Sequence, residues 1–133
     1  MENEEQMKEK YMQFQAIQQQ LEQINEHLET LMQQNSEVEI SINAIKEIGK
    51  TEVNNDILAP VANGIFIKAK LLDNQKLIVN VGSDTTVEKT VPEVVKLLEE
   101  QQKQMNKKMV EADSMMQELS SQAMKMYQEI ENK

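Results

Sequence analysis

Carboxylates, amides and lysines are the commonest side chains of this chain that could do chemistry. The single histidine, His27, is followed by Leu28, Glu29 and Thr30, so the metal-binding helix motif HExxH is absent. With no cysteine, the chain has no thiolate nucleophile, thiolate metal ligand or disulfide. Glycine-rich phosphate loops of the GxGxxG or GxxxxGKS type are missing as well. We therefore expect no catalysis, no metal site and no cofactor, and we interpret the carboxylates as solvated helix flanks.

Charge and composition argue against several classes of partner. The 133 residues carry a net charge of −9 and include no arginine, so nothing would neutralise the phosphates of DNA or RNA. An anionic membrane surface is disfavoured for the same reason. No apolar run approaches the ~20 residues that span a bilayer, and the acidic N-terminus is unlike a signal peptide. We expect a cytoplasmic protein that binds neither nucleic acid nor membrane.

Two long segments carry the heptad pattern of a coiled coil, in which apolar residues recur in alternating steps of three and four. The first covers residues 5–48, with Lys10 and Asn35 as the polar positions of its seam. We expect Gly49 to end this helix in a left-handed conformation. The second covers residues 91–132, and Thr90 with Glu93 predicts a capping box at its start.

The segment between them, residues 57–89, loses the helical period and alternates with a period of two. Turn residues divide it into four short strands, which we place near 57–61, 65–72, 76–81 and 85–89. The fold class is therefore α+β, a long antiparallel two-helix coiled coil with two β-hairpins inserted between the helices. We treat residues 1–133 as a single domain.

The simplest arrangement of two seams of equal length folds the helices back on each other. Both helices advance by the same ~1.5 Å per residue, so the residue numbers of two facing positions have a constant sum. If the strands lie at one end, this sum is about 137 to 140. This register brings Phe14 near Ala123 and Met126. It also places Asn35 and Gln102 at one level, where a buried amide pair would fix the alignment.

At this point the sequence resembles the alpha-type subunits of prefoldin. The resemblance is sharpest in the strands, in Leu58-Ala59-Pro60-Val61, Gly64-Ile65-Phe66-Ile67-Lys68-Ala69, Leu77-Ile78-Val79-Asn80-Val81-Gly82 and Val87-Glu88-Lys89. Two hairpins, rather than one, are typical of the alpha type. The short polar N-terminus is similar to that of archaeal subunits, with a eukaryotic alpha-type paralogue as the alternative.

The resemblance implies a function and a set of partners. It implies a holdase chaperone that binds unfolded client proteins through coiled-coil tips, prevents their aggregation and passes them to a group II chaperonin. The implied assembly is a hetero-hexamer of two alpha and four beta-type prefoldin subunits, in which the hairpins contribute to an oligomeric β-barrel. We assign this oligomerisation role to Ile65, Phe66, Ile67, Leu77, Ile78 and Val79.

Apolar residues outside the seams gather at both ends of the two helices. Ile40, Ile48, Val94 and Leu97 lie near the strands, and we expect them to pack under the sheet. The off-seam residues near the free end are Tyr11, Met12, Met115, Met124 and Tyr127. The chain offers no core there, and exposed apolar surface indicates an interaction site. With the neighbouring seam residues they form our predicted client-binding tip: Met7, Tyr11, Met12, Phe14, Met115, Leu119, Met124, Met126, Tyr127 and Ile130.

Other interpretations of these features remain. The off-seam apolar residues are also compatible with a frayed end or a wider local core, and methionine also serves to fill gaps in a seam. The main alternative function is a coiled-coil scaffold or adaptor without chaperone activity. A factor that inserts a coiled-coil finger into a larger machine would need acidic residues at a tight helical hairpin. The connection here is formed by strands instead, which argues against that class.

Overall fold

The computed structural model describes residues 2–132 and contains two long helices with four strands between them. Helix α1 runs over Glu2–Lys50. It begins three residues earlier and ends two residues later than the heptad pattern predicts. Helix α2 runs over Val91–Glu131 and is followed by a last helical hydrogen bond from the Asn132 amide to the Gln128 carbonyl. The predicted α+β architecture of two antiparallel helices and two hairpins is confirmed.

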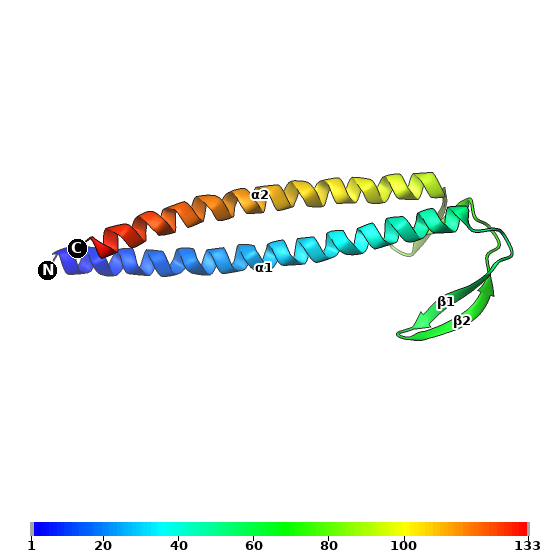
Figure 1. Cartoon of the computed structure of the whole chain (residues 1–133), viewed down its shortest axis with the longest axis horizontal. Helices are drawn as coiled ribbons and strands as arrows, with labels where there is room; N and C mark the ends of the chain where they lie inside the picture. Colours follow the sequence, from blue (N-terminus) through cyan, green and yellow to red (C-terminus); the bar gives the residue numbers. More distant parts are fainter. Residues whose placement is uncertain (1, 133) are drawn as a thin grey trace. The chain divides into compact units, whose positions relative to one another are not determined.

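The chain divides into two compact units, which we describe separately. Unit 1 consists of residues 2–36 and 103–132, and unit 2 of residues 37–102. In unit 1 the first turns of α1 lie beside the last turns of α2, and the two helices run in opposite directions (Figure 1). Unit 2 contains the end of α1, the four strands and the start of α2.

The predicted seams match the burial pattern of both helices. Every seam position between Met7 and Ile45 of α1 is buried or half-buried, while every other described side chain over that stretch is exposed. On α2 the predicted seam from Val91 to Ile130 is equally well protected. The most deeply buried hydrophobic residues are Ile17, Leu31, Ile42, Val94 and Ala112. In each unit, the protected helix side chains therefore form a narrow stripe along α1 and along α2.

Contacts between the helices fix their register. In unit 1 the Lys10 ammonium lies 3.3 Å from the Glu129 carboxylate, and Phe14 packs against Tyr127. In unit 2 the Gln102 side-chain amide donates a hydrogen bond to the Glu39 carboxylate. The residue numbers of these pairs add up to about 139 to 141, within a residue or two of the predicted register. That Asn35 and Gln102 lie at one level of the coiled coil stays a prediction.

Gly49 differs from the prediction, because it lies inside α1 and does not end it. Its φ is not in the left-handed region, and a Cβ at this position would lie 3.2 Å from Cγ1 of Val91. The missing side chain thus permits a close approach between the end of α1 and the start of α2. The helix ends at Lys50 instead, where Thr51 donates from its amide to the Ile48 carbonyl and from its hydroxyl to the Glu47 carbonyl.

The strands form two separate antiparallel hairpins close to the predicted positions. Strands β1 (Asp56–Ala62) and β2 (Ile65–Lys70) form the first, and strands β3 (Lys76–Gly82) and β4 (Thr85–Thr90) form the second. Each hairpin has a register shift just before its turn. The turns need left-handed residues, which are Gly64 in the first hairpin and Ser83 with Asp84 in the second.

Hydrogen bonds tie the hairpins to the helix ends within unit 2. The Asn54 amide donates to the Leu71 carbonyl at 2.7 Å, and the Asn74 side chain donates to the Thr51 carbonyl at 2.9 Å. At the other end, the Val91 amide donates to the Gln75 carbonyl, so that α2 starts directly from the strand. Thr90 accepts from the Glu93 amide at 3.3 Å and is the N-cap that the sequence predicts.

Candidate interaction surfaces

The predicted tip residues fall into an inner and an outer group in unit 1. Five of them are half-buried seam residues: Met7, Phe14, Leu119, Met126 and Ile130. The other five expose more than half of their surface: Tyr11, Met12, Met115, Met124 and Tyr127. The outer group consists of large apolar or amphipathic side chains that no part of unit 1 covers. Side chains of this kind mark an interaction site where they lie close together, whereas single exposed apolar residues are common on protein surfaces.

One aromatic contact and one hydrogen bond organise the end of unit 1. The rings of Phe14 and Tyr127 lie against each other, and the Tyr127 hydroxyl donates to the Glu131 carboxylate at 2.9 Å. This hydrogen bond and the negative charge of Glu131 raise the pKa of Tyr127. Tyr127 is therefore an exposed side chain that also joins the two helices. Tyr11, Met12 and Met124 have no comparable contact among the described residues.

Met115 and Leu119 lie apart from the terminal group. They line a hollow of about 360 Å³ together with Gln20, Gln23 and Ile24. Met115 is twelve residues from Tyr127, or about 18 Å along the helix at ~1.5 Å per residue. The ten predicted residues are therefore spread along unit 1 and do not form one compact patch.

The second surface is formed by the hairpins of unit 2, whose two faces both carry apolar side chains. Ala59 pairs with Ile67 and Pro60 with Phe66, so these two pairs point to opposite faces of the first hairpin. Ile65, Phe66 and Ile67 are 58%, 54% and 52% exposed. In the second hairpin Leu77 and Val79 are half-buried, whereas Ile78 is exposed. A two-stranded sheet with open faces and edges is marginally stable by itself and invites pairing with other strands.

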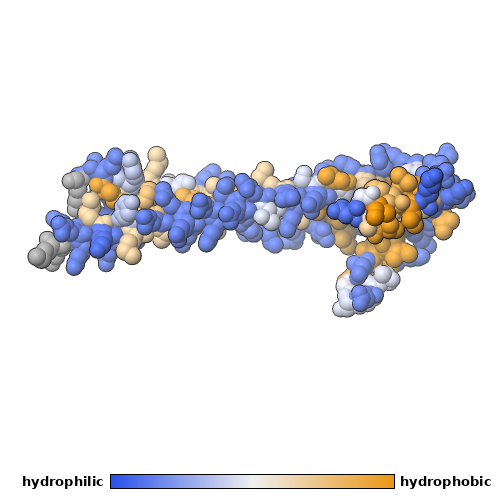
Figure 2. All heavy atoms as spheres, turned by 90° about the horizontal axis from the view of Figure 1, so that it is seen from below, coloured by the Kyte–Doolittle hydropathy of each residue, from blue (hydrophilic) through white to orange (hydrophobic). Residues whose placement is uncertain are grey.

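Some exposed residues of unit 2 were missed by the sequence prediction. Leu58, Val61, Leu72 and Val81 are more than half exposed, and Leu72 reaches 83%. The available signal was the run of apolar residues on both faces of β1 and β3, which is typical of strands covered on both sides. Figure 2 shows hydrophobic atoms gathered around the strands of this unit.

The expectation that Ile40, Ile48, Val94 and Leu97 pack under the sheet is wrong for Ile40 and stays a prediction for the other three. Val94 is buried and Ile48 is half-buried. Ile40 is 66% exposed and Leu97 is 38% exposed, so the prediction is wrong for Ile40. The reason is that the strands of the single chain leave that side of α1 uncovered.

Residues that could carry other chemistry are dispersed. His27 is exposed on α1. Within residues 2–132, no group of three histidine, cysteine or carboxylate side chains could hold a metal ion. No helix in this part of the chain is long and apolar enough to cross a membrane.

The chain is an antiparallel helix pair with two uncovered hairpins between its helices. These features define a coiled-coil subunit with exposed apolar surfaces that are suited to binding partners. The chain matches the Prefoldin subunit family over residues 17–133. It belongs to the prefoldin family, which consists of non-enzymatic chaperone subunits.

The relatives are archaeal alpha subunits. The chain is 34% identical over 91 residues to "Prefoldin subunit alpha" of Methanococcus aeolicus, covering 68% of this chain and 61% of that protein. It is 33% identical over 103 residues to "Prefoldin subunit alpha 1" of Methanocaldococcus jannaschii, covering 77% and 70%. It is 32% identical over 71 residues to "Prefoldin subunit alpha" of Thermofilum pendens, covering 53% of this chain and 55% of that protein. The match thus spans about three fifths of the length of several of these relatives.

A solved structure shares the fold. The cryo-electron microscopy structure of filamentous PFD from Methanocaldococcus jannaschii superposes with a TM-score of 0.77 and 19% identity. It covers 86% of this chain and 95% of the other. At this identity the likeness shows the fold alone.

Proposed function

We propose that the chain is the alpha-type subunit of a prefoldin complex and acts as a holdase for unfolded proteins. One observation carries the proposal: large apolar side chains of unit 1, above all Tyr11, Met12 and Met124, are more than half exposed beside the chain ends. Methionine adapts to many partner shapes because its thioether chain is unbranched, which suits a binder of diverse clients. Each side chain that a client buries fully contributes about 1.5–3 kcal/mol before ordering costs.

The hairpins support a proposal for the assembly. We propose that Ile65, Phe66, Ile67, Leu77, Ile78 and Val79 pair with strands of beta-type subunits, in a hetero-hexamer of two alpha and four beta chains with a β-barrel at its centre. The exposed apolar faces of both hairpins support this arrangement. Residues 1–133 would then act as one domain, with several tips binding one client and gaining avidity.

The remaining parts of the proposal rest on family membership. We propose that the complex works in the cytoplasm without ATP or another cofactor, catalyses no reaction, and passes its clients to a group II chaperonin. Nucleic acid and membrane are not expected partners, in line with the net charge of −9. The alternative function, a scaffold or adaptor without holding activity, uses the same fold.

The test compares tip and control variants in the complex assembled with full-length beta-type subunits. The tip variant carries Tyr11→Ser, Met12→Ser and Met124→Ser and leaves the Phe14–Tyr127 contact intact. The control carries Met32→Ser and Val110→Ser, which remove exposed apolar side chains elsewhere in unit 1, 61% and 70% exposed. We expect weaker binding of a fluorescent unfolded client for the tip variant only. Equal binding by wild type and tip variant, over a range of client sizes, would assign the gripping to the beta subunits.

A further inference from the structure

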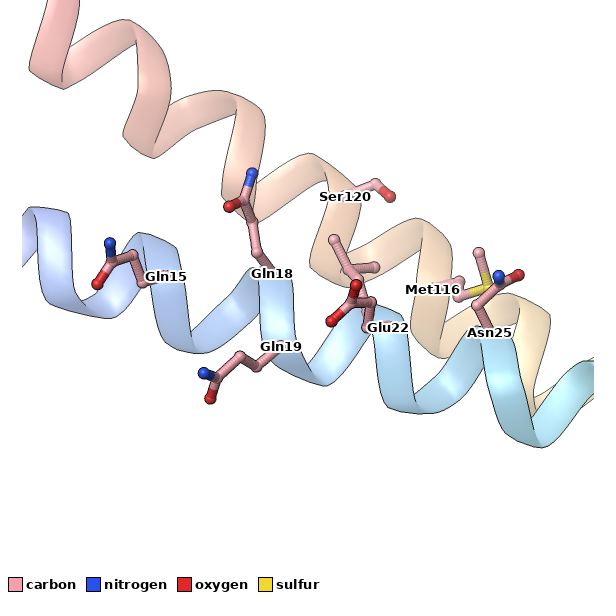
Figure 3. A pocket seen from close by; sticks show the side chains of 8 residues that line it. Gln15, Gln18, Gln19, Glu22, Asn25, Met116 and Ser120 are labelled. Atoms are coloured by element: carbon pink, nitrogen blue, oxygen red, sulfur yellow. The ribbon is translucent and has the colours of Figure 1, made fainter.

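A glutamine-lined groove runs along one side of unit 1, next to the outer tip residues. It has a volume of about 710 Å³, and its lining is given by Gln15, Gln18, Gln19, Leu21, Glu22, Asn25, Met116 and Ser120. In Figure 3 the amide side chains project from α1, while Met116 and Ser120 lie across from them on α2. Leu21 and Met116 are half-buried seam residues and give the groove its apolar part.

The lining combines free amides with very little charge. A glutamine side chain offers two donors and one acceptor oxygen, and Gln15, Gln18 and Gln19 make none of the side-chain hydrogen bonds found within residues 2–132. Glu22 is the one ionisable group of the lining. The groove therefore suits a ligand that needs both donors and acceptors and that is neutral or basic.

The groove is continuous with the proposed tip. Tyr11 precedes Gln15 by four residues on α1, and Met124 follows Ser120 by four residues on α2. Residues four apart share one face of a helix, so both exposed side chains extend the groove towards the chain ends. The stretch from Gln15 to Asn25 is about 15 Å long, enough for about four or five residues of extended chain.

We propose that this groove binds the main chain of an unfolded client in extended form, and so makes the contact with clients independent of their sequence. An unfolded chain presents one amide donor and one carbonyl acceptor at almost every residue, and these match the free glutamine amides. The apolar side chains of the client would then contact Leu21, Met116 and the outer tip residues. The inference rests on the proposed holdase function and assigns its binding site to residues beyond the tip.

The test uses two pairs of exposed glutamines of α1, one pair that lines the groove and one pair outside it. Gln15→Met with Gln18→Met removes two of the four groove amides but keeps the side-chain length and the helix. Gln33→Met with Gln34→Met makes the same change at two exposed glutamines of α1 that line neither the groove nor the smaller hollow. Each variant is assembled with beta-type subunits, and its Kd is measured by anisotropy for a fluorescent polypeptide kept unfolded by reduction and alkylation of its cysteines.

We expect the groove variant to raise Kd at least about threefold, because it loses two side chains that hydrogen-bond to the client, while the beta-type subunits still contribute to binding. The control should stay within about twofold of wild type. A photo-crosslinking amino acid at position 18 should capture the polypeptide, and one at position 33 should not.

Binding by the groove variant that equals or exceeds wild type would overturn the main-chain contact, because methionine adds apolar surface. An equal loss in both variants would overturn the assignment to this face. In either case binding by wild type still supports the holdase function, which fails only if the wild-type complex does not bind the polypeptide.

Discussion

The ring centroids of Phe14 and Tyr127 lie 6.1 Å apart, with the ring planes tilted by 37°. This contact joins the beginning of α1 to the end of α2, close to the ion pair between Lys10 and Glu129. Such a tilted aromatic pair is attractive beyond the area that it buries. The end of unit 1 is therefore held together in a defined arrangement, which places Tyr11, Met12 and Met124 on a stable support.

The aromatic pair predicts a measurable stability effect. Phe14→Ala should lower the free energy of unfolding by about 1–3 kcal/mol, less than for a fully buried phenylalanine because Phe14 is only half-buried. Tyr11→Ala removes an exposed ring and should change it by less than about 0.5 kcal/mol. Urea unfolding followed by circular dichroism measures both. Equal effects of the two substitutions would show that the pair does not stabilise unit 1.

Replacing Asn35 should stabilise the protein, whereas Phe14→Ala should destabilise it. Its side-chain oxygen is buried and has no hydrogen-bond partner, which costs about 1–3 kcal/mol relative to a satisfied or apolar group. Asn35→Leu should therefore raise the melting temperature. Gln102→Leu should change it little or lower it, because Gln102 donates to Glu39.

The same substitution tests the alignment role of Asn35. Cysteines introduced at positions 10 and 129 should crosslink within one chain, and Asn35→Leu should increase crosslinks in shifted registers. A single register in both backgrounds would mean that the polar residue does not fix the alignment.

Much of this fold could be predicted because the patterns are long and simple. The seam residues from Met7 to Ile130 obey one period over both helices, and burial of a helix pair depends directly on that period. The prediction for Gly49 was wrong because a glycine can either end a helix or permit the close approach of another element. Only the position of Val91 beside Gly49 distinguishes these two roles. The glutamine groove could not be predicted from the sequence, because it depends on which exposed faces of α1 and α2 lie side by side.

A single negative charge introduced into either hairpin should prevent assembly. Ile67→Asp or Val79→Asp should leave helical content unchanged and abolish the complex with beta-type subunits, since a carboxylate would be buried without a partner. Asn80→Asp adds the same charge in β3, where the side-chain oxygen already accepts from the Gly82 amide at 2.9 Å, and should be tolerated. Native mass spectrometry distinguishes the outcomes. Intact hexamers with both aspartate variants at 67 and 79 would contradict the assigned interface.

Asp73 predicts a pH dependence in the segment before β3. Its carboxylate accepts hydrogen bonds from the amides of Gln75 and Lys76 at 2.8 and 3.1 Å, and these hold its pKa below the ordinary value of 3.8. Because the folded pKa is lowered, the stabilisation is present above the unfolded pKa and is lost as pH falls through the folded value. An NMR titration of the Asp73 carboxyl should give a midpoint below 3.8, and a midpoint at or above it would contradict the two hydrogen bonds.

The central claim is that this chain, in its complex, holds unfolded proteins. The most direct measurement is light scattering from a chemically denatured enzyme diluted into buffer without ATP, with the complex at stoichiometric amounts. The wild-type complex and the Met32→Ser, Val110→Ser control should suppress aggregation, and the tip variant should suppress it less well. Aggregation at the same rate with and without the wild-type complex would contradict this claim and favour the scaffold.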